Sequence, residues 1–411
     1  MDRKRFEELI RVAGPITPEG LEQYIGDLEC SDSKLLPAET LSTVLEDNQV
    51  TGELKDRLMD ALDAVNACPE LVELGGIMAR DAVRSLHRCT ACEFTQPKPA
   101  CLEGFAREAF AFLFTQRCVL EGRKALRARG VPEEYDRDIP ERMTRKQLRK
   151  YRDTGDISFD DYSWDMNFYA CGIFLLDRFY FIPYRWEETP EAWRNRTTGR
   201  VAALWKGGVR VRQDGQLDGV NGITDSEAFT TVYEDDGERI TANPVSPEGH
   251  IRAKTVTLKR TEWEKVLGEG DYLIALHIPG GPGYTPERIR NSCLLALDFF
   301  GKYYPEYRYA GFWSESWLFD PAIGAILGPE RNISRVQRQF YCYPTMEGDD
   351  MARLEVLHDA KADYRIFRAK TALERGMFSA WDRGERFHTT GVFLLKEEVP
   401  GVGKDPYWKE G

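Results

Sequence analysis

The sequence predicts an α+β protein. A helical N-terminal domain over residues 1–165 is followed by a domain over 166–411 with a mixed, mostly antiparallel sheet and flanking helices. Three observations lead there. Apolar residues recur at helical spacing in the first part, turn-bounded β-prone segments dominate the second, and a strand–loop–helix unit spans 271–300.

Helical periodicity is clearest at two places in the first domain. Leu54, Leu58, Leu62 and Val65 follow one another at spacings of four, four and three. The segment 104–130 places apolar residues among alanines and charges and ends at a glycine. Since almost nothing here alternates as a strand, we expect a packing or lid domain rather than a separate activity.

The second domain carries strand and turn signals from its start. The aromatic run 168–186 predicts one long strand, bulged in its middle, and a hairpin is expected around 206–208. A short helix is predicted at 262–267, and strands are predicted at 309–318 and 389–395.

A Pro/Gly cluster links the strand and the helix of the unit at 271–300. The apolar run Tyr272–Ile278 precedes Pro279-Gly280-Gly281-Pro282-Gly283, and Thr285 and Pro286 are suited to cap and open a helix. Free N–H groups and the helix dipole would favour an anion at this place. An ordinary strand-to-helix connection is the alternative.

Composition limits the classes of function. The net charge of −12 argues against a broad nucleic-acid-binding surface. No apolar run is long enough for a membrane span, and the N-terminal segment lacks a signal-peptide core. Nine irregularly spaced cysteines in 411 residues fit reduced thiols, so we expect a cytoplasmic protein. The oligomeric state does not follow from the sequence.

A Cys-x-x-Cys pair needs separate consideration. Cys89 and Cys92 lie between His87 and Cys101, but these four residues match no zinc-ligand spacing, and a thioredoxin-like βαβ context is missing. We therefore predict plain thiols and no metal site.

The strand order in the second domain resembles the GNAT acyltransferase fold. More narrowly, the chain resembles a family that pairs a helical N-acyltransferase N-terminal domain with a GNAT-like C-terminal domain. The resemblance is carried by residues 263–279 (WEKVLGEGDYLIALHIP), 315–321 (ESWLFDP), 332–340 (NISRVQRQF) and 371–395. It covers most of the chain and is clearest from about residue 165 onward.

The resemblance implies that the glycine loop and the following helix bind the pyrophosphate of an acyl-CoA co-substrate. The backbone donors would come from Gly280, Gly281, Gly283, Tyr284 and Thr285. Two prolines replace donors that the family's usual Gly-x-Gly loop would offer. Further along, Asn332 and Arg335 are candidates for the CoA arm, although Asn332 could instead cap a helix.

Acyl transfer to an amine needs a base and a polarised thioester. His277, at the end of the strand before the loop, has an ordinary pKa suited to a general base. Glu315 is the alternative, because period two would place it between Trp313 and Trp317 and raise its pKa by desolvation. Ser316 is a third candidate, but no Gly-x-Ser-x-Gly elbow supports a covalent role.

The sequence thus predicts an N-acyltransferase that moves a short acyl group from acyl-CoA to a small amine or peptide. The rival is a non-catalytic ligand-binding or protein-interaction module on the same scaffold. If the first is correct, the strand ending at Ile278 and the strand 309–318 should be parallel neighbours that diverge at their C-terminal ends.

Overall fold

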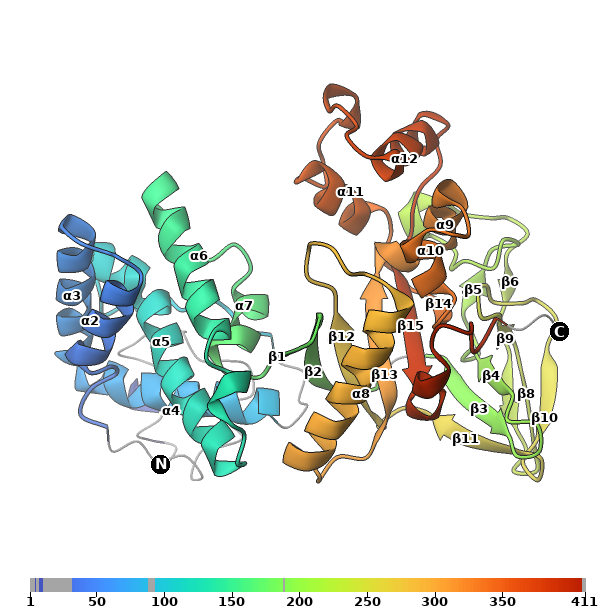
Figure 1. Cartoon of the computed structure of the whole chain (residues 1–411), viewed down its shortest axis with the longest axis horizontal. Coiled ribbons are helices and arrows are strands. Elements are labelled where there is room, and N and C mark those ends of the chain that lie inside the picture. The colour runs from blue at the N-terminus through green and yellow to red at the C-terminus, as the bar shows by residue number, and fades with distance from the viewer. Residues whose placement is uncertain (1–3, 5–6, 10–31, 88–92, 188, 409–411) are drawn as a thin grey trace. The chain divides into compact units, whose positions relative to one another are not determined.

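A computed structural model describes residues 4, 7–9, 32–87, 93–187 and 189–408 (Figure 1). The chain divides into two compact units, Met1–Leu175 and Leu176–Gly411. The domain boundary expected from the sequence, after residue 165, stays a prediction. Each unit is described by itself. Among the described residues, none of the helices combines the length and the apolar character needed to cross a bilayer.

The first unit is helical, as the sequence predicts. Its helices are α2 (Ala38–Asp47), α3 (Glu53–Asn66), α4 (Pro69–His87), α5 (Gly104–Ala128), α6 (Ile139–Thr154) and α7 (Tyr162–Tyr169). The middle of α5 is buried almost all round, and α3 and α4 both pack along it. Gly122 allows a close approach, because a Cβ there would lie 2.5 Å from the carbonyl oxygen of Ala170.

The second unit is built on a six-stranded sheet. Its strands, in spatial order, are β1 (Phe174–Leu176), β2 (Phe179–Arg185), β12 (Tyr272–His277), β13 (Tyr309–Ser316), β15 (Thr390–Leu395) and β14 (Tyr341–Pro344). β12 and β13 are parallel, whereas β12–β2, β13–β15 and β14–β15 are antiparallel. The predicted mixed, mostly antiparallel sheet is therefore confirmed.

The single long strand predicted over 168–186 is wrong. The segment starts inside α7 and continues as two strands, β1 and β2, joined at Asp177 and Arg178. Asp177 takes a positive φ of 58°, which makes a tight turn rather than a bulge. Its carboxylate accepts a hydrogen bond from Ser292 and pairs with Arg288, so tertiary contacts hold the turn.

Three small sheets lie between β2 and β12 in the chain. They are β11-β3-β4-β9 (Trp263–Leu267, Glu191–Asn195, Val201–Leu204, Pro244–Val245), β10-β8-β7 (Val256–Lys259, Arg239–Ala242, Tyr233–Asp235) and β5-β6 (Arg210–Val211, Phe229–Thr230). The helix predicted at 262–267 is β11 instead, because this segment pairs along β3. The Tyr341 hydroxyl joins this region to the main sheet, donating to Val245 and accepting from the Ala203 N–H.

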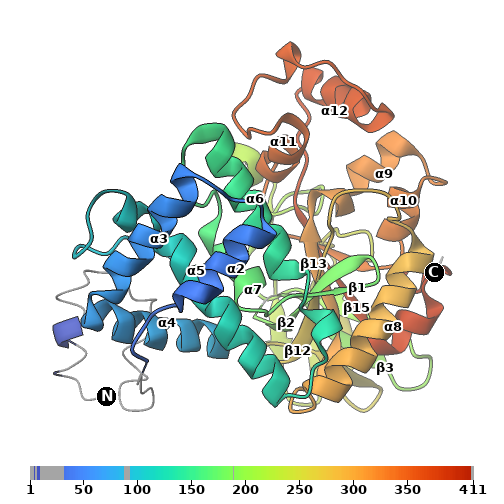
Figure 2. The ribbon, with the colours of Figure 1, turned by 60° about the vertical axis from the view of Figure 1, so that its left-hand side comes forward.

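Helices flank the main sheet (Figures 1 and 2). They are α8 (Pro286–Tyr303), α9 (Pro321–Leu327), α10 (Asn332–Gln337), α11 (Asp350–Leu357) and α12 (Ala372–Asp382). α8 follows β12 and buries Ile289, Cys293, Ala296 and Phe300. α11 and α12 belong to the connection between β14 and β15, and Trp317, Ile323, Met377 and Trp381 contribute to a hydrophobic cluster beneath them.

Candidate active site

The parallel strands β12 and β13 stop pairing before their C-terminal ends. Their last paired residues are Ala275 and Trp313. Beyond this point, β12 pairs only with β2 on its other side, and β13 pairs only with β15. A gap therefore opens in the hydrogen-bonded sheet, and the predicted arrangement of parallel neighbours that diverge is confirmed.

His277 and Glu315 lie on the two strands that border this gap. Each is two residues beyond the last pair, so strand alternation places both side chains on the face that carries Trp313. Both are half-buried. Burial lowers the pKa of His277 to about 4, and the imidazole is therefore neutral at neutral pH. The unshifted pKa assumed from the sequence does not apply.

Three aromatic side chains lie in contact beside the gap on this face. Trp313 stacks on Tyr184 with ring centroids 4.3 Å apart, and its indole N–H donates to the Tyr343 hydroxyl over 2.8 Å. Gly391 lies between Glu315 and Tyr343 across the strands. A Cβ at Gly391 would come within 2.2 Å of the Tyr343 ring, so the glycine is what allows the ring to lie there.

The sequence predicts that Trp313 and Trp317 lie on either side of Glu315 on one strand face. This is correct for Trp313 and wrong for Trp317. β13 ends at Ser316, whose hydroxyl accepts the N–H of Leu318 over 3.2 Å and begins a 3₁₀ turn, Trp317–Phe319. Trp317 therefore leaves the strand face and joins the cluster beneath α11 and α12. In this position Ser316 acts as a helix cap.

The glycine loop follows β12 as predicted. Gly281 and Gly283 take φ values of +107° and +91°, which favour glycine. Within the described chain, the backbone N–H groups of Gly280, Gly281, Gly283 and Tyr284 donate to no other protein group. The loop carbonyls are held instead: the Arg178 guanidinium donates to Pro279, Gly281 and Pro282 over 2.7–2.9 Å. This leaves four backbone donors next to a helix N-terminus.

That helix, α8, has the expected cap. The Thr285 hydroxyl accepts the N–H of Arg288 over 3.3 Å, and Pro286 occupies the first turn. Arg335 on α10 reaches the same end and pairs with Glu287 over 3.0 Å. Asn332 is exposed at the start of α10 and does not cap it, because the N-cap position belongs to Arg331. The alternative role considered for Asn332 is therefore wrong.

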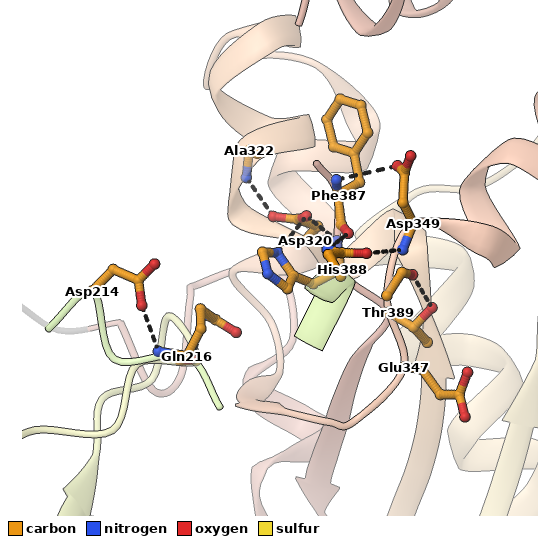
Figure 3. A network of polar contacts seen from close by, with 12 residues as sticks. Asp214, Gln216, Asp320, Ala322, Glu347, Asp349, Phe387, His388 and Thr389 are labelled. Carbon is orange, nitrogen blue, oxygen red and sulfur yellow. Dashed lines mark hydrogen bonds and ion pairs between the residues drawn. The ribbon is translucent and has the colours of Figure 1, made fainter. Parts of the chain in front are cut away.

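A second group of polar residues lies where β15 begins (Figure 3). Asp320 accepts the backbone N–H of His388 over 2.7 Å, and its Oδ2 lies 3.6 Å from His388 Nδ1. Both side chains are largely buried, at 5% and 15% exposure. The other ring nitrogen, Nε2, is buried and has no hydrogen-bond partner in the described chain. An unsatisfied buried polar atom costs about 1–3 kcal/mol, so its retention needs a reason.

Sequence reasoning missed Arg178, Asp320 and His388. Arg178 is more than 100 residues from the loop that it holds. Asp320 and His388 are 68 residues apart, and although both lie in segments that carry the family resemblance, neither was assigned a role from the sequence. The available signals were local ones: Asp320 precedes a proline that opens α9, and His388 directly precedes a predicted strand.

The residues around the Cys-x-x-Cys pair form no metal site in the part that can be described. Cys89 and Cys92 lie outside the described residues. His87 is buried in the first unit, and its Nε2 lies 3.2 Å from the Ala170 carbonyl oxygen. The sulfur atoms of Cys101 and Cys68 are 3.9 Å apart. In the described ranges, no three His, Cys, Asp or Glu side chains are placed to share a metal ion.

Comparison with known proteins defines the class. Residues 193–394 match the family described as a GNAT-like C-terminal domain, and residues 39–171 match the N-acyltransferase N-terminal domain. Two solved structures share the fold over 96% of this chain. One is an acyltransferase in complex with decanoyl-CoA (15% identity, TM-score 0.56, 99% of its chain covered). The other is an acyltransferase in complex with decanoyl-CoA and teicoplanin (16% identity, TM-score 0.53, 96% covered). No curated protein matches the sequence.

The fold with a split between β12 and β13 is thus that of a GNAT-like acyltransferase. The chain belongs to the acyltransferase family that joins an N-acyltransferase N-terminal domain to a GNAT-like C-terminal domain.

Proposed function

We propose that this protein is an N-acyltransferase that moves an acyl group from acyl-CoA to a small amine or peptide. The observation that carries the proposal is the gap beyond Ala275 and Trp313, with the glycine loop and the N-terminus of α8 at the end of the same strand. An acyl thioester needs such a gap, and a pyrophosphate needs backbone donors and a helix N-terminus.

In the proposed complex, the CoA pyrophosphate is bound by the backbone N–H groups of the glycine loop. Arg178 supports this role, because it occupies the loop carbonyls and keeps the loop in one conformation. Arg335, which pairs with Glu287 in the first turn of α8, is the side-chain donor proposed for the phosphates, and Asn332 is exposed on the same helix as Arg335. The prolines reduce the number of donors but leave four in place.

The chemistry is assigned to the residues that border the gap. The amine nitrogen attacks the thioester carbonyl, the C–N bond forms, the C–S bond breaks, and a proton passes from nitrogen to the leaving sulfur. His277 and Glu315 are the proposed groups for this transfer. A neutral His277 is also able to donate a hydrogen bond to the carbonyl oxygen.

Acyl chain length and acceptor are the open parts of the proposal. The sequence favours a short acyl group, whereas the two related structures contain decanoyl-CoA, so chain length has to be tested from acetyl to decanoyl. Teicoplanin, present in one of them, belongs in the acceptor panel with small amines and peptides.

The test combines binding with turnover. We expect acyl-CoA to raise the melting temperature, with stabilisation of about 2.7 kcal/mol at 100 times the dissociation constant. Release of free CoA thiol should then depend on an added amine. Arg335→Gln should weaken acyl-CoA binding, and Arg145→Gln, an exposed arginine in the first unit, is the matched control. Binding without turnover on any amine would favour the ligand-binding rival, and no melting response to any acyl-CoA would favour the interaction module.

A further inference from the structure

We propose that Cys68 and Cys101 form an oxidisable thiol pair that exchanges with a low-molecular-weight disulfide and closes into an intrachain disulfide. The pair lies in the first unit, and this role goes beyond the proposed acyl transfer. The two Sγ atoms are 3.9 Å apart, although the residues are 33 positions apart in the chain. A bond between them would tie the junction of α3 and α4 to the loop 93–103, which precedes α5.

Both thiols of the pair can be reached by a small reagent. Cys101 is exposed and Cys68 is partly exposed. The other cysteines of the described chain are buried: Cys118, Cys171, Cys293 and Cys342. Thiol–disulfide exchange requires access of one sulfur atom to another, so exposure directs the reaction to the pair.

The backbone holds the two cysteines next to each other. Cys68 stands between α3 and α4, and its carbonyl accepts the N–H of Val72 over 3.1 Å. On the other side, the buried Pro99 and Leu102 flank Cys101, and the Leu102 N–H donates to the Pro99 carbonyl over 3.4 Å. A disulfide needs the sulfur atoms about 2.05 Å apart. Closing the remaining distance takes side-chain rotation and a small shift of a turn that has no regular secondary structure.

The surroundings of the pair favour a disulfide over a metal site. Glu70 is the nearby carboxylate, and its Oε2 lies 4.0 Å from Cys68 Sγ. Across the ranges that the structure describes, no three His, Cys, Asp or Glu side chains are placed to share a metal ion. Because a structural zinc site uses four ligands, two thiols beside one carboxylate are an incomplete set. Two adjacent thiols are, by contrast, all that a disulfide needs.

The environment of Cys101 keeps its thiol protonated at neutral pH. Partial desolvation of the sulfur, the neighbouring Cys68 thiol and the charge of Glu70 raise the pKa of Cys101 to about 11. A dithiol that gains nothing from ionisation does not stabilise its reduced state, so the disulfide that it forms resists reduction. We therefore expect slow closure and a lasting bond. In a reducing compartment the pair stays open, in agreement with the reduced thiols expected from the sequence.

The exchange takes place in two balanced steps. The Cys68 thiolate attacks one sulfur of a disulfide RS–SR, the reagent's S–S bond breaks, and RS⁻ leaves and takes up a proton. Cys101 then loses its proton and attacks the Cys68 sulfur of the mixed disulfide, which forms the intrachain bond and releases the second RS⁻. Two protein thiols are oxidised, and one small disulfide is reduced to two RSH molecules.

The bond would secure a loop that supports the segment after α6. The Phe94 N–H donates to the Ser163 hydroxyl in α7, and the Gln96 side chain accepts the Phe159 N–H, both over 3.0 Å. A disulfide between positions 68 and 101 also removes freedom from the unfolded chain. Oxidation should therefore raise the melting temperature of the transition that includes the first unit by roughly 4–10 °C.

Incubation of the full-length protein with oxidised glutathione tests the pair. After free thiols are blocked with N-ethylmaleimide, mass spectrometry of unreduced peptides should find the Cys68–Cys101 cross-link as the main disulfide. Dithiothreitol should remove the cross-link together with the gain in melting temperature. The proposal would be overturned by glutathione adducts that persist on the pair, by a main cross-link from either residue to Cys89 or Cys92, or by no reaction at either residue.

Three variants separate the bond from other effects of oxidation. Cys101→Ser should fold, because this side chain is exposed, and should keep a glutathione adduct on Cys68 without any gain in melting temperature. Cys68→Ser should likewise show no gain. Ala100→Ser, a change at the exposed neighbour, keeps both thiols and should cross-link as the wild-type protein does. An equal rise in melting temperature in Cys101→Ser and the wild-type protein would contradict the proposal.

Discussion

Ala275 and Trp313 are the last residues through which the parallel strands β12 and β13 are joined. The strands continue for two and three residues more, each supported only by its outer neighbour. Because backbone N–H and C=O groups in a sheet are normally paired, an unpaired stretch between adjacent strands is an exception that calls for a functional explanation. It is also the feature from which the assignment of the acyl thioester site starts.

The first prediction concerns Arg178, which donates to three carbonyls of the glycine loop. Hydrogen bonds from a charged donor contribute about 1.5–3 kcal/mol each, so Arg178→Met should let the loop move. We expect acyl-CoA affinity to fall at least about tenfold, which corresponds to about 1.4 kcal/mol. Titration calorimetry with decanoyl-CoA measures it, and Arg145→Met is the surface control. Unchanged affinity would show that the conformation of the glycine loop does not contribute to CoA binding.

The second prediction concerns Gly391. Alanine would place a Cβ 2.2 Å from the Tyr343 ring, so the ring must leave and its hydrogen bond with Trp313 is lost. Overpacking of this kind costs about 1–3 kcal/mol. Gly391→Ala should lower the urea midpoint followed by tryptophan fluorescence.

Gly301 offers the matched control. It lies exposed within α8, and a Cβ there meets nothing within 4 Å. Gly301→Ala should therefore stabilise the protein by roughly 0.5–1 kcal/mol, because alanine loses less backbone entropy in a helix. Destabilisation of similar size in both variants would show that the effect at Gly391 is not a packing clash.

The third prediction concerns stability at acidic pH. Burial lowers the pKa of His87 from 6.5 to about 4. Between these values the unfolded chain binds a proton that the folded chain does not, so stability falls as pH falls from 6.5 toward 4. At about 1.4 kcal/mol per pKa unit the loss is roughly 3 kcal/mol.

His87→Gln should flatten this part of the stability profile, since glutamine can still donate to the Ala170 carbonyl. Urea unfolding at several pH values measures the slope. His358 is exposed with a φ of 60°, so His358→Asn is a suitable control and should leave the slope unchanged. If the slope is the same in all three proteins, protonation of His87 does not govern the acid transition.

Local patterns were enough for the elements with strong periodicity. The segment predicted as a helix from 104 to 130 is α5, and the strand–loop–helix unit is β12, the glycine loop and α8. In these cases the apolar spacing, the caps and the glycines all agree with the tertiary structure, and the sequence needed no long-range information.

The errors come from segments whose state is decided by partners far along the chain. Residues 262–267 read as a helix, yet Trp263, Lys265 and Leu267 pair with β3, about 70 residues earlier. Likewise, the Asp177 turn depends on Ser292 and Arg288 of α8. β-pairing of this kind overrides local propensity.

The residues of the candidate site also fall into those that local sequence could predict and those that depend on the assembled fold. His277, Glu315 and the glycine loop could be proposed from order along the chain, because a strand pair and its connection are local. The lowered pKa of His277 could not, since it depends on what buries the ring. The Asp320–His388 pair needs β15 to return beside β13, which only the assembled sheet provides.

The last prediction concerns the two groups at the gap. If His277 and Glu315 handle the proton that passes from nitrogen to sulfur, replacing either with glutamine keeps the shape and removes the titrating group. Loss of a positioned acid–base group costs about 10²- to 10⁴-fold in rate. We expect at least one of His277→Gln and Glu315→Gln to fold, bind acyl-CoA normally and turn over far more slowly.

A comparison of variants distinguishes a role in the chemistry from a purely structural role. A group at the thioester serves every nucleophile, so the loss should be similar with an alkylamine and with hydroxylamine. Since both residues are half-buried, the melting temperature should change little, and Ser316→Ala, which removes only a cap, should retain activity. Steady-state rates of CoA release for these three variants and the wild-type protein, measured across pH, test the assignment. Full activity in both gap variants would leave the assignment without support, because the chemistry would then proceed without either group that borders the gap.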